Sequence, residues 1–163
     1  MLTRARSRAT IWMILAAALA AAVVSAQDAA PTGGAAKVDQ LAKASGYSFS
    51  RKTDSVWAAD FVGKNLKNFR LVVAVQGDVL VTFVTVADKA RMPVNIAFMR
   101  KLLRYNSTLD RVKIGYDDDG DLFVRCDASV RVLDATEFHS IVDQVSAASD
   151  EVYKGIVEFL NQE

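Results

Sequence analysis

The sequence predicts an α+β domain in which helices flank a mainly antiparallel sheet of about five strands. Three observations support this fold class. Apolar residues alternate in several short segments, which is typical of strands, and recur every three or four residues in longer segments, which is typical of helices. Tight turns join neighbouring strand segments, so these strands must pair antiparallel. The predicted order is helix, three strands, helix, two to three strands and a long C-terminal helix.

The first 26 residues have the pattern of a secretory signal peptide. Three arginines precede an apolar run over residues 11–24, and small residues follow at Ser25 and Ala26, as a signal peptidase requires. The run is shorter than the roughly 20 residues that a membrane-spanning helix needs. We therefore expect cleavage after Ala26 and a periplasmic or secreted protein. The alternative is an uncleaved leader, which would be the chain's one connection to a membrane.

Residues 27–36 are predicted to form a flexible linker, and residues 37–163 to form one domain. A domain of this size can bury a sufficient core without crosslinks, and Cys126, as the single cysteine, has no partner for an intramolecular disulfide. Because Cys126 lies in a strand pattern, we expect it to be buried. Removal of the leader leaves acidic residues in slight excess, which argues against nucleic-acid binding.

The first half of the domain predicts a helix followed by three strands. A short helix is expected over residues 38–44, and an extended segment begins at Tyr47. Strands are expected over residues 56–62, 70–75 and 79–86, with turn sequences between them. The second and third of these strands are apolar on both faces, so we expect them to lie in the centre of the sheet.

The next segment predicts a helix over residues 93–105, opened by Pro93 and ended by Asn106 as a left-handed C-cap. Its basic residues are expected to form a solvated face together with one basic residue beyond the helix. This group consists of Arg100, Lys101, Arg104 and Arg111. Its apolar positions are expected on the opposite face: Ile96, Met99, Leu102 and Leu103.

The stretch GYDDDGDLFV crowds four carboxylates around one glycine, between alternating segments at residues 112–116 and 122–126. As a calcium-binding loop that starts at Asp117, it lacks the glycine at position six and the acid at position twelve. The Asp-Gly pair at its centre is instead a strong signal for a hairpin turn. We therefore expect the acidic residues to lie at the tip of a hairpin and not to form a specific calcium site.

The last element is predicted to be the longest helix. Asp134 and Glu137 form a capping box, and apolar residues keep helical spacing from Phe138 to the end of the chain. An unbroken helix would have about 27 residues and a length of roughly 40 Å. Ser149-Asp150 is the expected place for a bend or a restart.

The sequence shows no catalytic, metal-binding or nucleotide-binding motif. His139 is the single histidine, and neither a zinc ligand set nor a Gly-x-Ser-x-Gly motif accompanies it. We expect it on the surface or at a helix edge. No phosphate-binding glycine loop occurs. We therefore predict no cofactor, no metal site and no enzyme activity.

Two segments resemble a known family. They are "FMRKLLRYNSTLDRVKIGYDDDGDLFVRCDASVRVLDATEFHSIVDQVSAASDEVYKGI" and "FRLVVAVQGDVLVTFVTVA". The middle helix ends with Leu-Leu, Arg and Asn106. A strand, an Asp/Gly hairpin and a second strand follow. The last helix begins at Leu133 and Asp134. Over about residues 37–160 this pattern resembles YbjN-like proteins of the type III secretion chaperone-like fold.

The resemblance implies a helix-flanked antiparallel sheet and a non-enzymatic role, since members of the wider fold commonly dimerise and bind extended segments of other proteins. The secretion chaperones are cytoplasmic, whereas this chain has a predicted export signal. We therefore do not expect it to load type III effectors in the cytosol.

The expected function is an exported, chaperone-like or adaptor domain that binds a protein partner, with a homodimer left open. Two alternatives remain: a carrier of a small molecule or lipid in the periplasm, and an enzyme of unknown reaction. The predicted partner surface consists of Trp57, Phe61, Leu102, Leu103 and Tyr105.

Overall fold

The computed structural model describes residues 33–161 and confirms the predicted α+β fold. Six strands form one antiparallel sheet in the order β1-β2-β3-β4-β6-β5, where about five were expected. β3 and β4 lie in its centre, as predicted. The elements in chain order are α1 (Gly33–Ala44), β1 (Ser50–Thr53), β2 (Val56–Phe61), β3 (Phe69–Gln76), β4 (Val79–Ala87), η1 (Lys89–Arg91), α2 (Ile96–Thr108), β5 (Lys113–Tyr116), β6 (Leu122–Ser129), η2 (Val130–Val132) and α3 (Ala135–Leu160).

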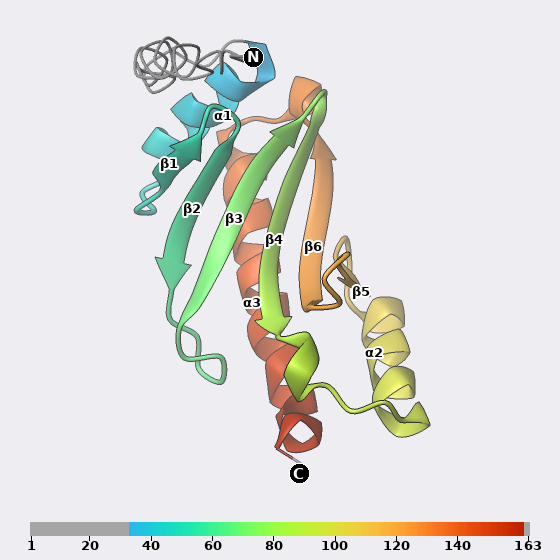
Figure 1. Ribbon diagram of the computed structural model, residues 1–163. Helices are drawn as coiled ribbons and strands as arrows, with labels where there is room; N and C mark the ends of the chain where they lie inside the picture. Colours follow the sequence, from blue (N-terminus) through green and yellow to red (C-terminus); the bar gives the residue numbers. More distant parts are fainter. Residues whose placement is uncertain (1–32, 162–163) are drawn as a thin grey trace, which may run out of the picture.

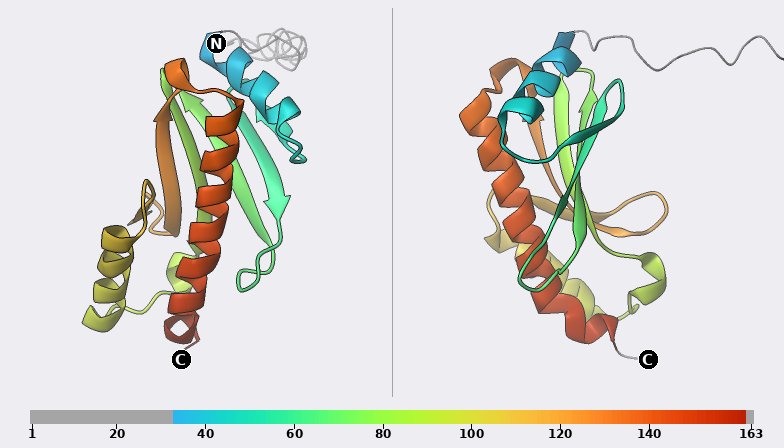
Figure 2. Two further views of the ribbon diagram at one scale, coloured as in Figure 1. Left: turned by 180° about the vertical axis from the view of Figure 1, so that it is seen from behind. Right: turned by 90° about the vertical axis from the view of Figure 1, so that its left-hand side faces the viewer.

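The sheet has one covered face and one open face. In Figure 1, α3 lies behind the sheet, where it packs against β4 and β6, and the side view in Figure 2 places α3 on one side of the strands. α1 packs at one end of this layer against α3, β3 and η2, whereas α2 packs near the other end against α3 and β5. The core between sheet and α3 contains fully buried aliphatic side chains, among them Leu71, Val73, Leu80, Val84, Ile141, Val142 and Val145.

α3 is one continuous helix of 26 residues. The predicted cap is confirmed, because the Asp134 carboxylate accepts a hydrogen bond from the Glu137 amide at 2.8 Å. The expected restart at Ser149-Asp150 is wrong, because the helix is unbroken there, and the alternative of a bend stays a prediction. The buried Ser149 hydroxyl donates to the Val145 carbonyl one turn earlier, so it finds its partner inside the helix. No described helix has both the length and the apolar character that crossing a membrane requires.

α1 begins at Gly33, so the last four residues of the predicted linker are helical. The start of the helix is docked: Gly34 lies against Val130, and the Lys37 ammonium donates to the carbonyls of Val130 and Arg131 at 2.9 and 3.0 Å. These contacts order a segment whose composition alone predicts flexibility. The predicted leader and residues 27–32 lie outside the described residues and stay predictions.

α2 differs from its prediction at both ends. Asn95, and not Pro93, caps its start by accepting from the Phe98 amide at 2.8 Å. Asn106 lies inside the helix, so its prediction as a C-cap is wrong. Its side chain instead accepts from the Ile114 amide at 2.7 Å and donates to the Ile114 carbonyl at 3.0 Å. Asn106 therefore joins α2 to β5, and Arg111 adopts the positive φ of 64° in the connection.

The acidic stretch forms the predicted hairpin turn between β5 and β6. Gly120 has a φ of 89° and donates from its amide to the Asp117 carbonyl at 3.0 Å. The Asp117 carboxylate accepts from the Asp121 amide at 2.9 Å, so part of the charge stabilises the turn itself. Cys126 in β6 is buried, as predicted, and burial raises the pKa of its thiol.

Candidate functional site

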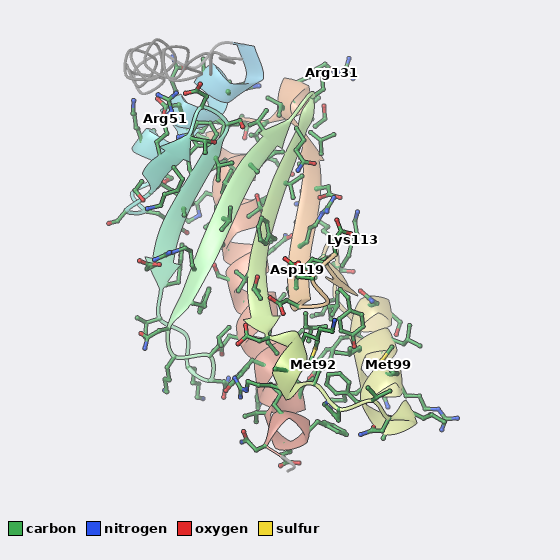
Figure 3. All side chains as sticks on the ribbon, in the orientation of Figure 1. Arg51, Met92, Met99, Lys113, Asp119 and Arg131 are labelled. Carbon is green, nitrogen blue, oxygen red and sulfur yellow. The ribbon has the colours of Figure 1, made fainter. Side chains whose placement is uncertain are left out.

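Five of the large apolar side chains that the described chain exposes gather around α2. They line a groove of about 640 Å³ between η1, the segment that leads into α2, the outer face of α2 and the end of β5. Met92 and Met99 lie on two sides of this region in Figure 3. The exposed residues are Val94, Ile96, Met99, Leu103 and Tyr116, with exposed fractions of 104%, 71%, 43%, 66% and 41%. We call this surface the α2 groove.

The α2 groove exists because α2 has two apolar faces. Phe98 and Leu102 point inward and are 0% and 5% exposed, and Phe98 lies against Phe159 of α3 with ring centroids 5.6 Å apart. Ile96, Met99 and Leu103 fall on an adjacent strip at three- and four-residue spacing, which places them along one line of the helix surface. One face therefore holds α2 on the domain, while the other remains in solvent.

The hairpin closes one side of the groove. The Tyr116 hydroxyl lies 3.4 Å from the Met99 sulfur. The side chain of Lys89 lies over Gly120, because a Cβ at Gly120 would come within 2.9 Å of the Lys89 Cδ. The Asp121 carboxylate accepts from the Lys89 amide at 2.8 Å. These contacts fix η1 to the hairpin and give the groove a defined wall.

The α2 groove is lined mainly by apolar residues and carries positive charge. Lys89 and Arg100 line it, and no acidic side chain from the described part of the chain does so. Burial raises the pKa of Tyr116, so its phenol stays neutral at physiological pH. Within residues 33–161, no three histidine, cysteine or acidic residues lie close enough together to hold a metal ion. The groove can therefore offer dispersion contacts and two cations to a ligand.

The structure separates the five residues of the predicted partner surface. Leu103 lies in the α2 groove. Phe61 and Tyr105 are partly buried at other places: Phe61 stacks on Phe69 at 5.7 Å, and Tyr105 contacts Gly155 of α3. Whether these three residues contact a partner stays a prediction.

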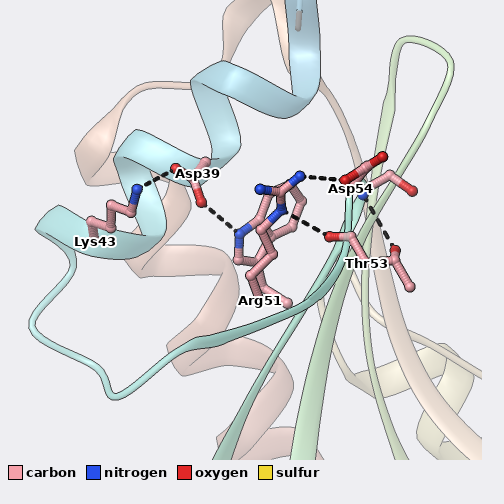
Figure 4. Close-up of polar contacts among 7 residues, drawn as sticks. Asp39, Lys43, Arg51, Thr53 and Asp54 are labelled. Atoms are coloured by element: carbon pink, nitrogen blue, oxygen red, sulfur yellow. Dashed lines mark hydrogen bonds and ion pairs between the residues drawn. The ribbon is translucent and has the colours of Figure 1, made fainter. Parts of the chain in front are cut away.

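Trp57 and Leu102 are corrections to the predicted surface, because they are 2% and 5% exposed. The Trp57 indole donates to the Asp39 carboxylate at 2.9 Å, and Lys43 pairs with the same carboxylate at 2.6 Å (Figure 4). The hydrogen bonds from Lys43 and Trp57 lower the pKa of Asp39. The polar end of Trp57 is thus satisfied inside the protein, between α1 and β2, so no partner is needed to explain it.

One protein-family model matches most of the chain. The YbjN family model, described as "Putative bacterial sensory transduction regulator", matches residues 35–158. The chain belongs to the YbjN family. This confirms the resemblance predicted from the sequence and covers nearly all of the described domain. No curated protein matches the chain.

Solved structures agree with the YbjN assignment. YbjN from E. coli is similar over 74% of this chain and 89% of its own, with a TM-score of 0.55 and 14% identity. A chain of the heterodimeric complex ExoU-SpcU from the type III secretion system of Pseudomonas aeruginosa is similar over 76% of this chain and 98% of its own, with a TM-score of 0.53 and 19% identity. At such identities these structures show a shared fold.

A third similar structure is a chain of the ExsC-ExsE complex, with a TM-score of 0.54 and 13% identity to this chain. The match covers 74% of this chain and 93% of that chain. Two of these three structures are therefore complexes of two different proteins, and the fold is one that occurs in protein complexes.

Proposed function

We propose that the chain is an exported YbjN-family domain that binds another protein, without enzyme activity, through the α2 groove. The observation that carries this proposal is the apolar outer face of α2, which the fold of the domain does not use. The similarity to chains from two-protein complexes supports a chaperone-like or adaptor role. The predicted leader over residues 1–26 supports export.

The α2 groove has the size and chemistry of a protein-binding surface. Ile96 and Leu103 are seven residues apart, so the exposed face extends about 10 Å along the helix. That length matches two turns of a partner's helix or three residues of a partner's strand. Burial of apolar area there would drive binding, and an exposed apolar patch of this kind is typical of interaction sites.

Site-specific photocrosslinking tests the proposal. A photoreactive phenylalanine analogue would replace Met99 in the full chain, which would then be exported and processed in its cells. We expect Met99 to form discrete crosslinked species with another protein or a second copy of the chain. The matched control is Val132 in η2, which is 74% exposed and outside the groove. Equal crosslinking from Val132, or none from Met99, would contradict the proposal.

Export is tested separately. Cell fractionation and mass measurement of the full chain should recover it outside the cytoplasm with Gln27 as its first residue. Recovery of the intact leader in the membrane fraction would support the anchored alternative, and recovery in the cytoplasm would contradict export. Neither result changes the expected crosslinking from Met99.

The carrier alternative rests on the same groove, since its volume and apolar lining also suit a drug-sized ligand. Native mass spectrometry of the purified chain distinguishes the two functions. Protein binding predicts no small molecule on the purified chain, whereas a bound lipid that disappears in Met99→Glu would favour the carrier.

A further inference from the structure

The single histidine of the chain lies in a cluster of three side chains at the opposite end of the domain from the α2 groove. His139 and Asp143 are one turn apart on α3, and the His139 Nδ1 lies 3.0 Å from an Asp143 carboxylate oxygen. Tyr47, in the connection between α1 and β1, places its hydroxyl 3.2 Å from His139 Nε2 and 2.5 Å from the other Asp143 oxygen. The predicted surface position of His139 is confirmed, with 51% of its side chain exposed.

The three contacts of this cluster need hydrogens at defined atoms. The phenol hydroxyl of Tyr47 has one hydrogen, and the 2.5 Å contact assigns that hydrogen to the bond with Asp143. The Tyr47 oxygen must then accept from His139 Nε2, while His139 Nδ1 must donate to Asp143. Both ring nitrogens carry hydrogen only in the imidazolium form. All three bonds can therefore form together only when His139 is protonated.

A neutral His139 loses one of the three bonds. If its hydrogen is on Nδ1, the lone pair of Nε2 faces a phenol oxygen whose hydrogen is already given to Asp143. If its hydrogen is on Nε2, the lone pair of Nδ1 faces a carboxylate. Burial and the bond to Asp143 raise the pKa of Tyr47 to about 12, so the phenol itself keeps its hydrogen at any physiological pH.

The residues around the hollow beside this cluster are mostly uncharged. The hollow beside it, about 620 Å³ in volume, is lined by residues of α1 and α3, and His139 and Asp143 are its titratable members. From the α1–β1 connection, Tyr47 is the titratable group that faces them. The remaining neighbours are uncharged: Leu41, Ala44, Ser45, Ala135, Thr136, Ser140 and Gln144.

The cluster connects two parts of the fold that are far apart in sequence. The Tyr47 ring also packs near Phe49 and Phe61, with centroids 6.2 and 5.3 Å away. Directly after this connection comes β1, an edge strand of four exposed residues. The bonds to α3 therefore hold the segment that leads into the sheet edge.

We propose that Tyr47, His139 and Asp143 form a pH-sensitive latch, which holds the α1–β1 connection on α3 when His139 is protonated and loosens it when His139 is neutral. The three-bond arrangement is complete when His139 is an imidazolium and Asp143 a carboxylate, and it lacks one bond when His139 is neutral. The periplasm exchanges protons with the surroundings more freely than the cytoplasm does. For an exported protein the latch would thus respond to external pH. This last step rests on the proposed export, but the latch itself does not.

Amide hydrogen exchange of the full chain tests the latch. The probes are the Tyr47 and Phe49 amides, which donate to the Ser45 hydroxyl and the Tyr47 carbonyl. After correction for intrinsic exchange rates, we expect their protection to fall about fivefold between about pH 5.5 and about pH 8, as for loss of one partly exposed hydrogen bond. The Ile114 amide, which is bonded to Asn106 far from the latch, should keep its protection. Equal protection of Tyr47 and Phe49 at both pH values would overturn the proposal.

Two variants separate the latch from general effects of pH. Tyr47→Phe keeps the aromatic packing and removes the hydroxyl, and His139→Gln removes the titration. Both should abolish the pH dependence of protection, and the double variant should add nothing further. Persistence of the full pH dependence in either single variant would overturn the latch. If a variant does not fold, NMR of the unaltered chain replaces it: the His139 ring and the Tyr47 amide must titrate with one midpoint, and two different midpoints would exclude the latch.

Discussion

α2 and α3 are both amphipathic helices, but they use their apolar residues differently. α3 spans 26 residues, and its apolar face from Phe138 to Leu160 is buried against the sheet, α1 and α2. α2 spans 13 residues and buries Phe98 and Leu102 while its other apolar face lies in solvent. The apolar residues of α3 are explained by folding, whereas half of those on α2 are not.

This difference identifies where the chain has apolar surface beyond the requirements of its core. An exposed apolar side chain adds nothing to the stability of an isolated domain, and several together favour association. Substitutions on α3 and on the inner face of α2 should change stability, and substitutions on the outer face of α2 should change binding with little change in stability.

The largest effect is expected from the core face of α3. Phe138→Ala removes a side chain that is 1% exposed, so we expect a loss of about 3–5 kcal/mol in the free energy of unfolding. Urea denaturation followed by circular dichroism measures it. The exposed Val132→Ala should change this free energy by less than about 0.5 kcal/mol. Similar unfolding midpoints for the two variants would contradict the assignment of Phe138 to the core.

The sharpest test of the two faces of α2 uses neighbouring leucines. Leu102 is 5% exposed and Leu103 is 66% exposed, although the two residues are chemically identical. We expect Leu102→Ala to lower the free energy of unfolding by about 2–4 kcal/mol and Leu103→Ala to change it by less than about 0.5 kcal/mol. The same denaturation experiment measures both. Equal losses from the two substitutions would remove the distinction between the inner and outer faces.

Most of the fold could be predicted from the sequence because its signals are local. The alternation of apolar residues predicted the central strands, and the Asp-Gly pair predicted the hairpin. Asp134 and Glu137 predicted the start of α3. The errors lie where tertiary contacts decide. Asn106 has the chemistry of a C-cap, yet its bonds to Ile114 across the α2–β5 connection keep it inside the helix. The sequence of α2 alone cannot predict that contact, because Ile114 lies in β5.

The α2 groove was predicted only in part. Leu103 was in the predicted surface, but Val94, Ile96, Met99 and Tyr116 were not, and Trp57 and Leu102 were placed there wrongly. Hydropathy cannot tell which of two apolar faces meets the core, since both have the same period. Phe98 is the residue that could have indicated the exposed apolar strip. When Phe98 is counted, α2 has more apolar residues than a narrow core-facing strip contains.

A medium effect is expected where α3 contacts the β2–β3 connection. Burial raises the pKa of Asp150, but hydrogen bonds from the Asn65 and Leu66 amides at 2.7 and 2.8 Å outweigh it and lower the pKa overall. A lowered pKa means that the stabilisation is present above the pKa of an unfolded aspartate, about 3.9, and is lost as the pH falls through the folded value. Asp150→Asn should therefore cost about 1 kcal/mol at neutral pH.

Urea denaturation as a function of pH checks this expectation. The difference between the unaltered chain and Asp150→Asn should shrink below about pH 4, because the unaltered carboxyl then becomes protonated too. Asp143→Asn, on the same helix, is a useful comparison, since Asp143 contacts the latch and not this loop. A constant difference between the unaltered chain and Asp150→Asn at all pH values would show that the charge of Asp150 does not stabilise the connection.

The smallest effect on stability, and the largest on binding, is expected from the outer face of α2. Leu103→Glu places a charge in the α2 groove but keeps a good helix former in an exposed position, so the free energy of unfolding should change by less than about 0.5 kcal/mol. Crosslinking from a photoreactive residue at Met99 should fall about tenfold, because a charge in an apolar contact must be desolvated. Val62→Glu, at a position that is 80% exposed on the β2–β3 connection, introduces the same charge away from the groove and should leave crosslinking unchanged. If both variants lowered crosslinking equally, net charge and not the outer face of α2 would govern association, and the contrast between α2 and α3 would carry no information about function.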